Sequence, residues 1–203
     1  MVGLGPGGRL DRTRRAEEAI SQSQVIVGYA PYLKMVADLA SGKELISSGM
    51  TQEIARCELS VRRARQGAIV ALLSSGDAGI YGMAGPALEL LAGREPELLV
   101  EIVPGVSAAQ AAAARLGAPL MLDYAAISLS DLLIPWVKIR SRLEAVAAAD
   151  LVVALYNQRS QKRVHQLERP HHSPRRMQAK QASHLPDLCW QHCRIVGKTG
   201  GTD

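Results

Sequence analysis

Residues 68–79 read AIVALLSSGDAG, and this stretch decides the fold. The run from Ala68 to Ser74 is apolar without alternation, which is typical of a strand buried on both faces of a sheet. The loop that follows is rich in glycine and leads into an apolar helical pattern. A buried strand, a glycine-rich loop and a helix indicate a parallel α/β sheet, in which ligands bind beyond the carboxyl ends of the strands.

Short apolar runs alternate with helical patterns through residues 1–156, and this alternation predicts an α/β fold with mostly parallel sheets. Further strands are expected at residues 1–4, 25–29, 44–47, 98–103 and 151–156. Helices are expected at residues 13–23, 51–66, 79–92, 107–116 and 135–149. We predict an N-terminal α/β domain over residues 1–117 and an incomplete second α/β domain over residues 118–168, beginning with a strand around 123–128.

The composition is that of a globular protein, because 47% of the 203 residues are hydrophobic and 21% are charged. No apolar run reaches the roughly 18–20 residues that a membrane span requires, and the first residues show no signal-peptide pattern. We therefore expect a cytoplasmic protein with no membrane partner. Three cysteines are too few for a disulfide framework. No metal site is expected, because Cys189, His192 and Cys193 lack the fourth ligand of a zinc site.

The positive charge of the chain lies near its end. Residues 157–203 hold nine Lys and Arg against three Asp and Glu, and they hold all five histidines. Three prolines interrupt any helix there, and no apolar run is longer than residues 188–190 or 195–196. We predict that residues 169–203 form an irregular basic tail and that the strand at 151–156 has an exposed edge. Nucleic acid is a weak candidate partner, because Trp190 alone offers no stacking platform.

Three glycine-containing segments leave alternatives open. Gly3-Leu-Gly-Pro-Gly-Gly8 has the G-x-G-x-x-G spacing of dinucleotide-binding folds, but Gly28-Tyr29 stands where such folds have an acidic residue. A structural turn explains that motif at least as well. Asp77 either accepts hydrogen bonds from a ligand or a backbone N–H, or caps the following helix. Ser107 is best interpreted as a helix N-cap, because Gly105-Val-Ser107 lacks the final glycine of a nucleophile elbow.

Several of these segments together resemble one family. The stretches VGLGPGG (2–8), VGY (27–29), GKE (42–44), SSGDAGIYGM (74–83) and VPGVSAA (103–109) are similar, in order and spacing, to motifs of the tetrapyrrole methylases. ISLSDLL (127–133), PW (135–136) and ALYN (154–157) resemble, within that family, the precorrin-3B C17-methyltransferases of cobalamin biosynthesis. The resemblance implies two α/β domains and a homodimer. It also implies methyl transfer to C17 of precorrin-3B, or of its cobalt-containing counterpart, with contraction of the ring.

The resemblance further implies that S-adenosyl-L-methionine binds in a cleft between the two domains. The loop around Asp77 would wrap its methionine and ribose portions, and residues 155–156 would close the adenine side. The residues that would contact the cofactor by this likeness are Pro6, Gly76, Asp77, Ala78, Ile80, Tyr81, Ser107, Ala108, Leu155 and Tyr156.

Catalysis by positioning is expected, since methyl transfer from a sulfonium needs an in-line approach by the nucleophilic carbon. Asp77 and Asp131 are the candidates for removing a proton or orienting the substrate. The likeness stops near Glu168, which predicts a frameshifted or truncated chain with weak cofactor binding and little turnover. The alternatives are an inactive member of the family, or an α/β module that binds a nucleotide or nucleic acid.

Overall fold

The computed structural model describes residues 1–49, 52–92, 97–157, 179–180 and 193–196. The chain divides into two compact units, Met1–Ser107 and Ala108–Asp203. None of the described helices is long and apolar enough to cross a membrane.

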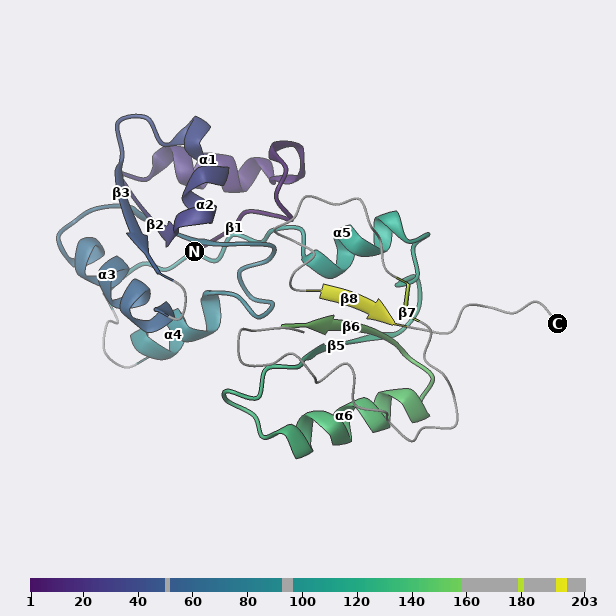
Figure 1. The fold of residues 1–203 in the computed structure, drawn as a ribbon. Coiled ribbons are helices and arrows are strands. Elements are labelled where there is room, and N and C mark those ends of the chain that lie inside the picture. The colour runs from purple at the N-terminus through teal and green to yellow at the C-terminus, as the bar shows by residue number, and fades with distance from the viewer. Residues whose placement is uncertain (50–51, 93–96, 158–178, 181–192, 197–203) are drawn as a thin grey trace. The chain divides into compact units, whose positions relative to one another are not determined.

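The first unit is a parallel four-stranded sheet with helices on both faces (Figure 1). In spatial order, its strands are β1 (Val2–Gly3), β4 (Val70–Ser74), β2 (Val25–Tyr29) and β3 (Glu44–Ser48). Its α-helices are α1 (Arg14–Gln22), α2 (Ala30–Met35), α3 (Glu53–Arg65) and α4 (Ala84–Leu91), and its 3-10 helices are η1 (Arg9–Asp11) and η2 (Ala37–Leu39).

Two apolar cores cover the two faces of this sheet. Ile20 of α1 packs with Ile26 of β2 and Leu73 of β4 on one face. Val27 of β2 and Leu72 of β4 pack on the other face with residues of α3 and α4. Each is the direct chain neighbour of a residue in the first core. This division follows from the alternation of side chains along a strand. The predicted buried strand at 68–74 is confirmed, because β4 lies between β1 and β2.

The second unit holds a mixed sheet in the order β5-β6-β8-β7. Strand β5 (Tyr124–Ser128) is parallel to β6 (Val152–Tyr156), whereas β8 (Cys193–Val196) is antiparallel to both β6 and β7 (Ala179–Lys180). Helices α5 (Ala108–Arg115) and α6 (Trp136–Ala148) lie on opposite sides of this sheet (Figure 1).

The second unit corrects two sequence predictions. The boundary predicted after residue 117 lies after Ser107, because α5 buries Ala109 against Ala154 and Tyr156 of the second sheet. The expected exposed edge at residues 151–156 is wrong, because Cys193–Val196 pair with Val153–Tyr156 of β6. The apolar pair at 195–196 was the sequence signal for β8. Apart from β7 and β8, the predicted basic tail, including Cys189 and His192, lies outside the described residues.

The first unit departs from the sequence predictions at three places. The strand expected at 98–103 is reduced to one bridge between Val103 and Val2, because β1 offers only two residues for pairing. The helix expected at 79–92 begins only at Ala84, since bends occupy the preceding residues and Tyr81 has a left-handed φ of 51°. Helix α2 was not expected, because six residues are too few for a periodic apolar pattern.

A backbone junction at the carboxyl edge of the first sheet joins three loops. A Cβ on Gly105 would stand 2.3 Å from the Gly76 carbonyl oxygen and 2.8 Å from the Gly3 carbonyl carbon. Gly5 and Gly76 also exchange two N–H···O bonds, of 3.0 and 2.8 Å. We call Gly3, Gly5, Gly76 and Gly105 the glycine junction. Gly3 is the last residue of β1, and Gly5 lies in the loop after it. Gly76 follows β4, and Gly105 precedes α5.

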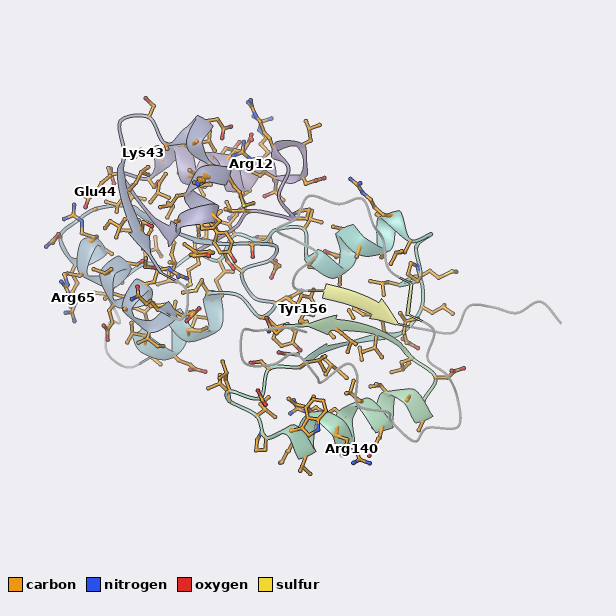
Figure 2. All side chains as sticks on the ribbon, in the orientation of Figure 1. Arg12, Lys43, Glu44, Arg65, Arg140 and Tyr156 are labelled. Atoms are coloured by element: carbon orange, nitrogen blue, oxygen red, sulfur yellow. The ribbon has the colours of Figure 1, made fainter. Side chains whose placement is uncertain are left out.

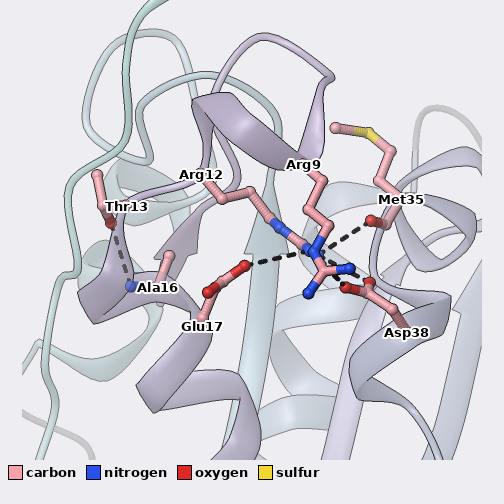
Figure 3. Close-up of polar contacts among 7 residues, drawn as sticks. All are labelled: Arg9, Arg12, Thr13, Ala16, Glu17, Met35 and Asp38. Atoms are coloured by element: carbon pink, nitrogen blue, oxygen red, sulfur yellow. Dashed lines mark hydrogen bonds and ion pairs between the residues drawn. The ribbon is translucent and has the colours of Figure 1, made fainter.

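Arg12 ties the loop after β1 to the segment after α2 (Figure 3). Its guanidinium donates hydrogen bonds of 3.0 and 2.6 Å to the Asp38 carboxylate and of 3.2 Å to the Met35 carbonyl, and the Glu17 carboxylate lies 3.2 Å away. The Arg12 side chain is 2% exposed, whereas that of Asp38 is 34% exposed. The hydrogen bonds from Arg12 lower the pKa of Asp38 below its usual 3.8.

Replacing Gly105 with alanine is expected to destabilise the first unit by about 1–3 kcal/mol, because the new Cβ would overlap the Gly76 carbonyl oxygen. Gly85→Ala is the matched control, since Gly85 lies in α4 with open space at the Cβ position and should gain up to about 1 kcal/mol. Urea unfolding followed by circular dichroism measures both changes. Equal stability of the two variants would contradict the claim that the glycine junction has no room for a Cβ at Gly105.

Asp38→Asn is expected to destabilise the protein at pH 7 and to lose this effect in acid. Because the pKa of Asp38 is lowered in the folded state, the stabilisation is present above the unfolded value near 3.8 and is lost as the pH falls below it. Melting temperatures of the wild type and the variant between pH 3 and 7 measure the difference. A difference that stays constant over that range would refute the assignment.

Candidate functional site

The loop that follows β4 carries five of the residues expected to contact a cofactor. Within it, Ile80 and Tyr81 are 40% and 52% exposed, whereas Ala78 is fully buried. Gly76 and Tyr81 both adopt left-handed backbone conformations, with φ of 58° and 51°. Such a conformation is uncommon for a tyrosine, and strained residues of this kind cluster at ligand sites. The loop therefore presents two apolar side chains on a backbone whose shape is imposed by its surroundings.

Asp77 ties this loop to the segment before α5. Its Oδ1 accepts a 2.8 Å hydrogen bond from the Gly79 N–H, and its Oδ2 accepts a 3.0 Å bond from the Gly105 N–H. Of the alternatives left open by the sequence, acceptance from backbone N–H groups is confirmed. The helix-cap alternative is wrong, because α4 begins only at Ala84. Contact between Asp77 and a ligand stays a prediction.

Pro6 and Ser107 lie beside the glycine junction. Pro6 is buried and directly follows Gly5, which is bonded to Gly76. Ser107 is 2% exposed and immediately precedes α5, the position expected for an N-cap residue. Ala108 is the first residue of α5 and belongs to the second unit. The structure thus brings Pro6 and Ser107, but not Ala108, into the same unit as the Asp77 loop.

The G-x-G-x-x-G spacing serves the glycine junction in this structure. In a dinucleotide-binding fold a helix starts directly at the last glycine and points its N-terminus at the pyrophosphate. Here η1 follows Gly8, and α1 begins only at Arg14, capped by the Thr13 side chain. The structural-turn interpretation of this motif is therefore the one that fits.

Leu155 and Tyr156 lie at the carboxyl end of β6 on opposite faces of the second sheet (Figure 2 labels Tyr156). Leu155 packs with Ile127 and Ile139 on the α6 side. Tyr156 packs on the α5 side, and its hydroxyl oxygen accepts a 3.2 Å hydrogen bond from the Ala109 N–H. The two side chains therefore lie on different faces of the sheet, and their contact with a cofactor stays a prediction.

The carboxyl ends of β5 and β6 carry a second set of polar groups. The Ser128 hydroxyl oxygen accepts hydrogen bonds from the Asn157 side-chain amide at 2.9 Å and from the Ser130 N–H at 3.2 Å. Asp131 follows in the same loop and is exposed. The two carboxylates considered for catalysis therefore belong to different units, Asp77 to the first and Asp131 to the second.

Tyr29 and Tyr32 were missed as site residues. Their rings meet edge to face with centroids 5.4 Å apart, and the Ser75 hydroxyl donates a 3.0 Å hydrogen bond to the Tyr32 hydroxyl oxygen. Ser75 is the first residue of the loop after β4, so this bond attaches α2 to the candidate site. The signal available in the sequence was a pair of tyrosines, one at the end of the expected strand at 25–29 and one three residues later.

Two relatives of this chain carry the name of a methyltransferase. It is 46% identical over 169 residues to a probable cobalt-factor III C(17)-methyltransferase from Salmonella typhimurium, covering 83% of this chain and 70% of that protein. It is 45% identical over 171 residues to the cobalt-factor III methyltransferase from Priestia megaterium, covering 82% of this chain. The chain spans about a third of the length of the Priestia megaterium protein, 32%.

Solved structures show the same fold. The crystal structure of the methyltransferase CobJ aligns with a TM-score of 0.80 and 31% identity, over 98% of this chain and 95% of that one. A uroporphyrin-III C-methyl transferase from Thermus thermophilus, complexed with S-adenosyl homocysteine, aligns with a TM-score of 0.57 and 24% identity over 77% of this chain and 68% of that one, which shows a shared fold.

A family model described as Tetrapyrrole (Corrin/Porphyrin) Methylases matches residues 1–198. This match extends past Glu168, where the recognisable motifs of the sequence end. It covers both units and reaches beyond β8. With 46% identity to the Salmonella typhimurium relative, it shows that this chain belongs to the tetrapyrrole methylase family.

Proposed function

We propose that this chain transfers the methyl group of S-adenosyl-L-methionine to C17 of a tetrapyrrole, either cobalt-factor III or precorrin-3B, in cobalamin biosynthesis. The names of relatives at 45–46% identity and the nearly full-length alignment with CobJ support this assignment. The structural observation that carries it is the glycine junction with its Asp77 tether, which holds three loops together at the carboxyl edge of a parallel sheet.

The residues of this edge fit S-adenosyl-L-methionine better than a dinucleotide. The loop over residues 75–83 contains no Lys or Arg and exposes the apolar side chains of Ile80 and Tyr81. A pyrophosphate needs a helix N-terminus or cations. The loop over residues 75–83 carries no cation, and α4 begins only after its last residue. An adenosyl group and a methionine zwitterion need apolar surface and backbone hydrogen bonds, which the loops supply.

The bound cofactor would supply an electrophilic methyl group, whose bond to sulfur breaks with the electron pair staying on sulfur as the bond to C17 forms. The protein's part is to hold the two reactants in line, which can account for much of the acceleration. Cys57 does not act as a nucleophile, because it is 1% exposed and desolvation raises the pKa of its thiol to about 11.

Asp131 is the carboxylate that we propose for proton removal or substrate orientation, on the ground of its position. Both oxygens of Asp77 already accept backbone N–H groups, so this side chain acts on the shape of the loop. Asp131 lies in an exposed loop at the carboxyl end of β5, where ligands of parallel sheets bind. The homodimer and the cytoplasmic location stay predictions.

The activity test uses the purified chain with S-adenosyl-L-methionine carrying a ¹³C-methyl group, and with cobalt-factor III or precorrin-3B in separate reactions. The expected product carries one labelled methyl group on carbon, and S-adenosylhomocysteine forms in equal amount. The tetrapyrrole that reacts decides between the cobalt-containing and cobalt-free substrates. Binding of S-adenosylhomocysteine without turnover would identify an inactive family member. Salt-dependent nucleic-acid binding without affinity for S-adenosylhomocysteine would favour the binding-module alternative.

Asp77→Ala is expected to weaken S-adenosylhomocysteine binding by about tenfold or more, because the loop after β4 loses two charge-assisted hydrogen bonds to backbone N–H groups. Isothermal titration calorimetry measures the affinity. Asp123→Ala is the matched control, since Asp123 is exposed in the second unit and its loss should leave binding unchanged. Unchanged affinity in Asp77→Ala would remove this loop from the cofactor site.

A further inference from the structure

Tyr32 and Ser75 together carry one unused hydrogen-bond donor beside the candidate cofactor loop. Their hydroxyl oxygens lie 3.0 Å apart and share one hydrogen bond, so one of the two hydroxyl protons has to find another acceptor. Among the residues that the structure describes, no hydrogen bond donated by Tyr32 is found. The side chain is half-buried, and it packs against the core of the first unit.

Three contacts fix the direction of this hydroxyl. The Tyr32 ring packs on the apolar core of the first unit, and the Tyr29 ring meets it edge to face at an interplanar angle of 89°. The Ser75 hydroxyl holds the phenol oxygen from the loop side. The Tyr32 side chain therefore loses little conformational entropy when its O–H binds an acceptor. A small entropy loss favours the affinity for the ligand that carries the acceptor.

The Ser75 bond also strengthens Tyr32 as a donor. A hydroxyl that accepts a hydrogen bond is polarised and donates its own proton more strongly, as in other hydrogen-bond chains. The strongest acceptors for such a donor are anionic oxygens. Both β2 and β4 end at this edge, so the phenol lies where the sheet is expected to bind its ligand.

We propose that the Tyr32 hydroxyl donates a hydrogen bond to a carboxylate of a bound ligand. This inference rests on the proposed function, in which both ligands carry carboxylates: the methionyl part of the cofactor and the side chains of the tetrapyrrole. Tyr32→Phe removes the donor and keeps the ring. Tyr124→Phe is the matched control, because it removes a hydroxyl from a 42% exposed tyrosine of the second unit.

The experiment compares affinities for S-adenosylhomocysteine and for 5′-methylthioadenosine, which lacks the amino-acid portion, together with the KM for the tetrapyrrole. If the cofactor carboxylate is the acceptor, Tyr32→Phe weakens S-adenosylhomocysteine binding by about tenfold and leaves 5′-methylthioadenosine binding unchanged. If a tetrapyrrole carboxylate is the acceptor, the KM for the tetrapyrrole rises by a similar factor while both nucleoside affinities stay constant. Tyr124→Phe should change none of these values.

Two results would overturn the inference. An equal loss of affinity for both nucleosides would show that Tyr32 acts only by supporting Ser75 and the loop. No change in any of the three values would show that the hydroxyl contacts no ligand. Failure of the wild type to bind S-adenosylhomocysteine and to transfer a methyl group would instead refute the proposed function, so the two failures are distinguishable.

Discussion

The close approach of three backbones at the carboxyl edge of the first sheet is the constraint on which the rest of the site depends. Gly3 and Gly105 leave no room for a Cβ, which would stand 2.7 and 2.3 Å, respectively, from the Gly76 carbonyl oxygen. Because the loops cannot separate without breaking the Gly5–Gly76 pair, Asp77 finds the Gly105 N–H within 3.0 Å. The shape of the loop after β4 is therefore set by backbone packing, which leaves Ile80 and Tyr81 exposed.

Continuous apolar runs made the sheet predictable from the sequence. β2 occupies the expected residues 25–29, and β4 fills most of the run at 68–74, because strands covered on both faces need Val, Ile or Leu at nearly every position. Apolarity alone misled at residues 98–103, where Leu99 is fully exposed and only Val103 finds a partner in β1. The residues at 98–103 carry no sign that β1, their pairing partner, is only two residues long.

Long-range contacts made the site less predictable. The loop after β4 was expected from its glycines, but the partner of Asp77 lies far along the chain at Gly105. The pairing of β8 with β6 depends on a segment still further along the chain, and the basic residues around it concealed the strand. Leu155 and Tyr156 were grouped by the family resemblance, and alternation along a strand sends their side chains to opposite faces.

The central claim is that the loops of the glycine junction hold the cofactor, and amide hydrogen exchange with and without S-adenosylhomocysteine tests it most directly. Slower exchange is expected in residues 3–8, 75–83 and 103–107 when the ligand is present, because binding stabilises loops whose local opening controls exchange. Exchange that stays unchanged in all three segments under saturating ligand would contradict the account.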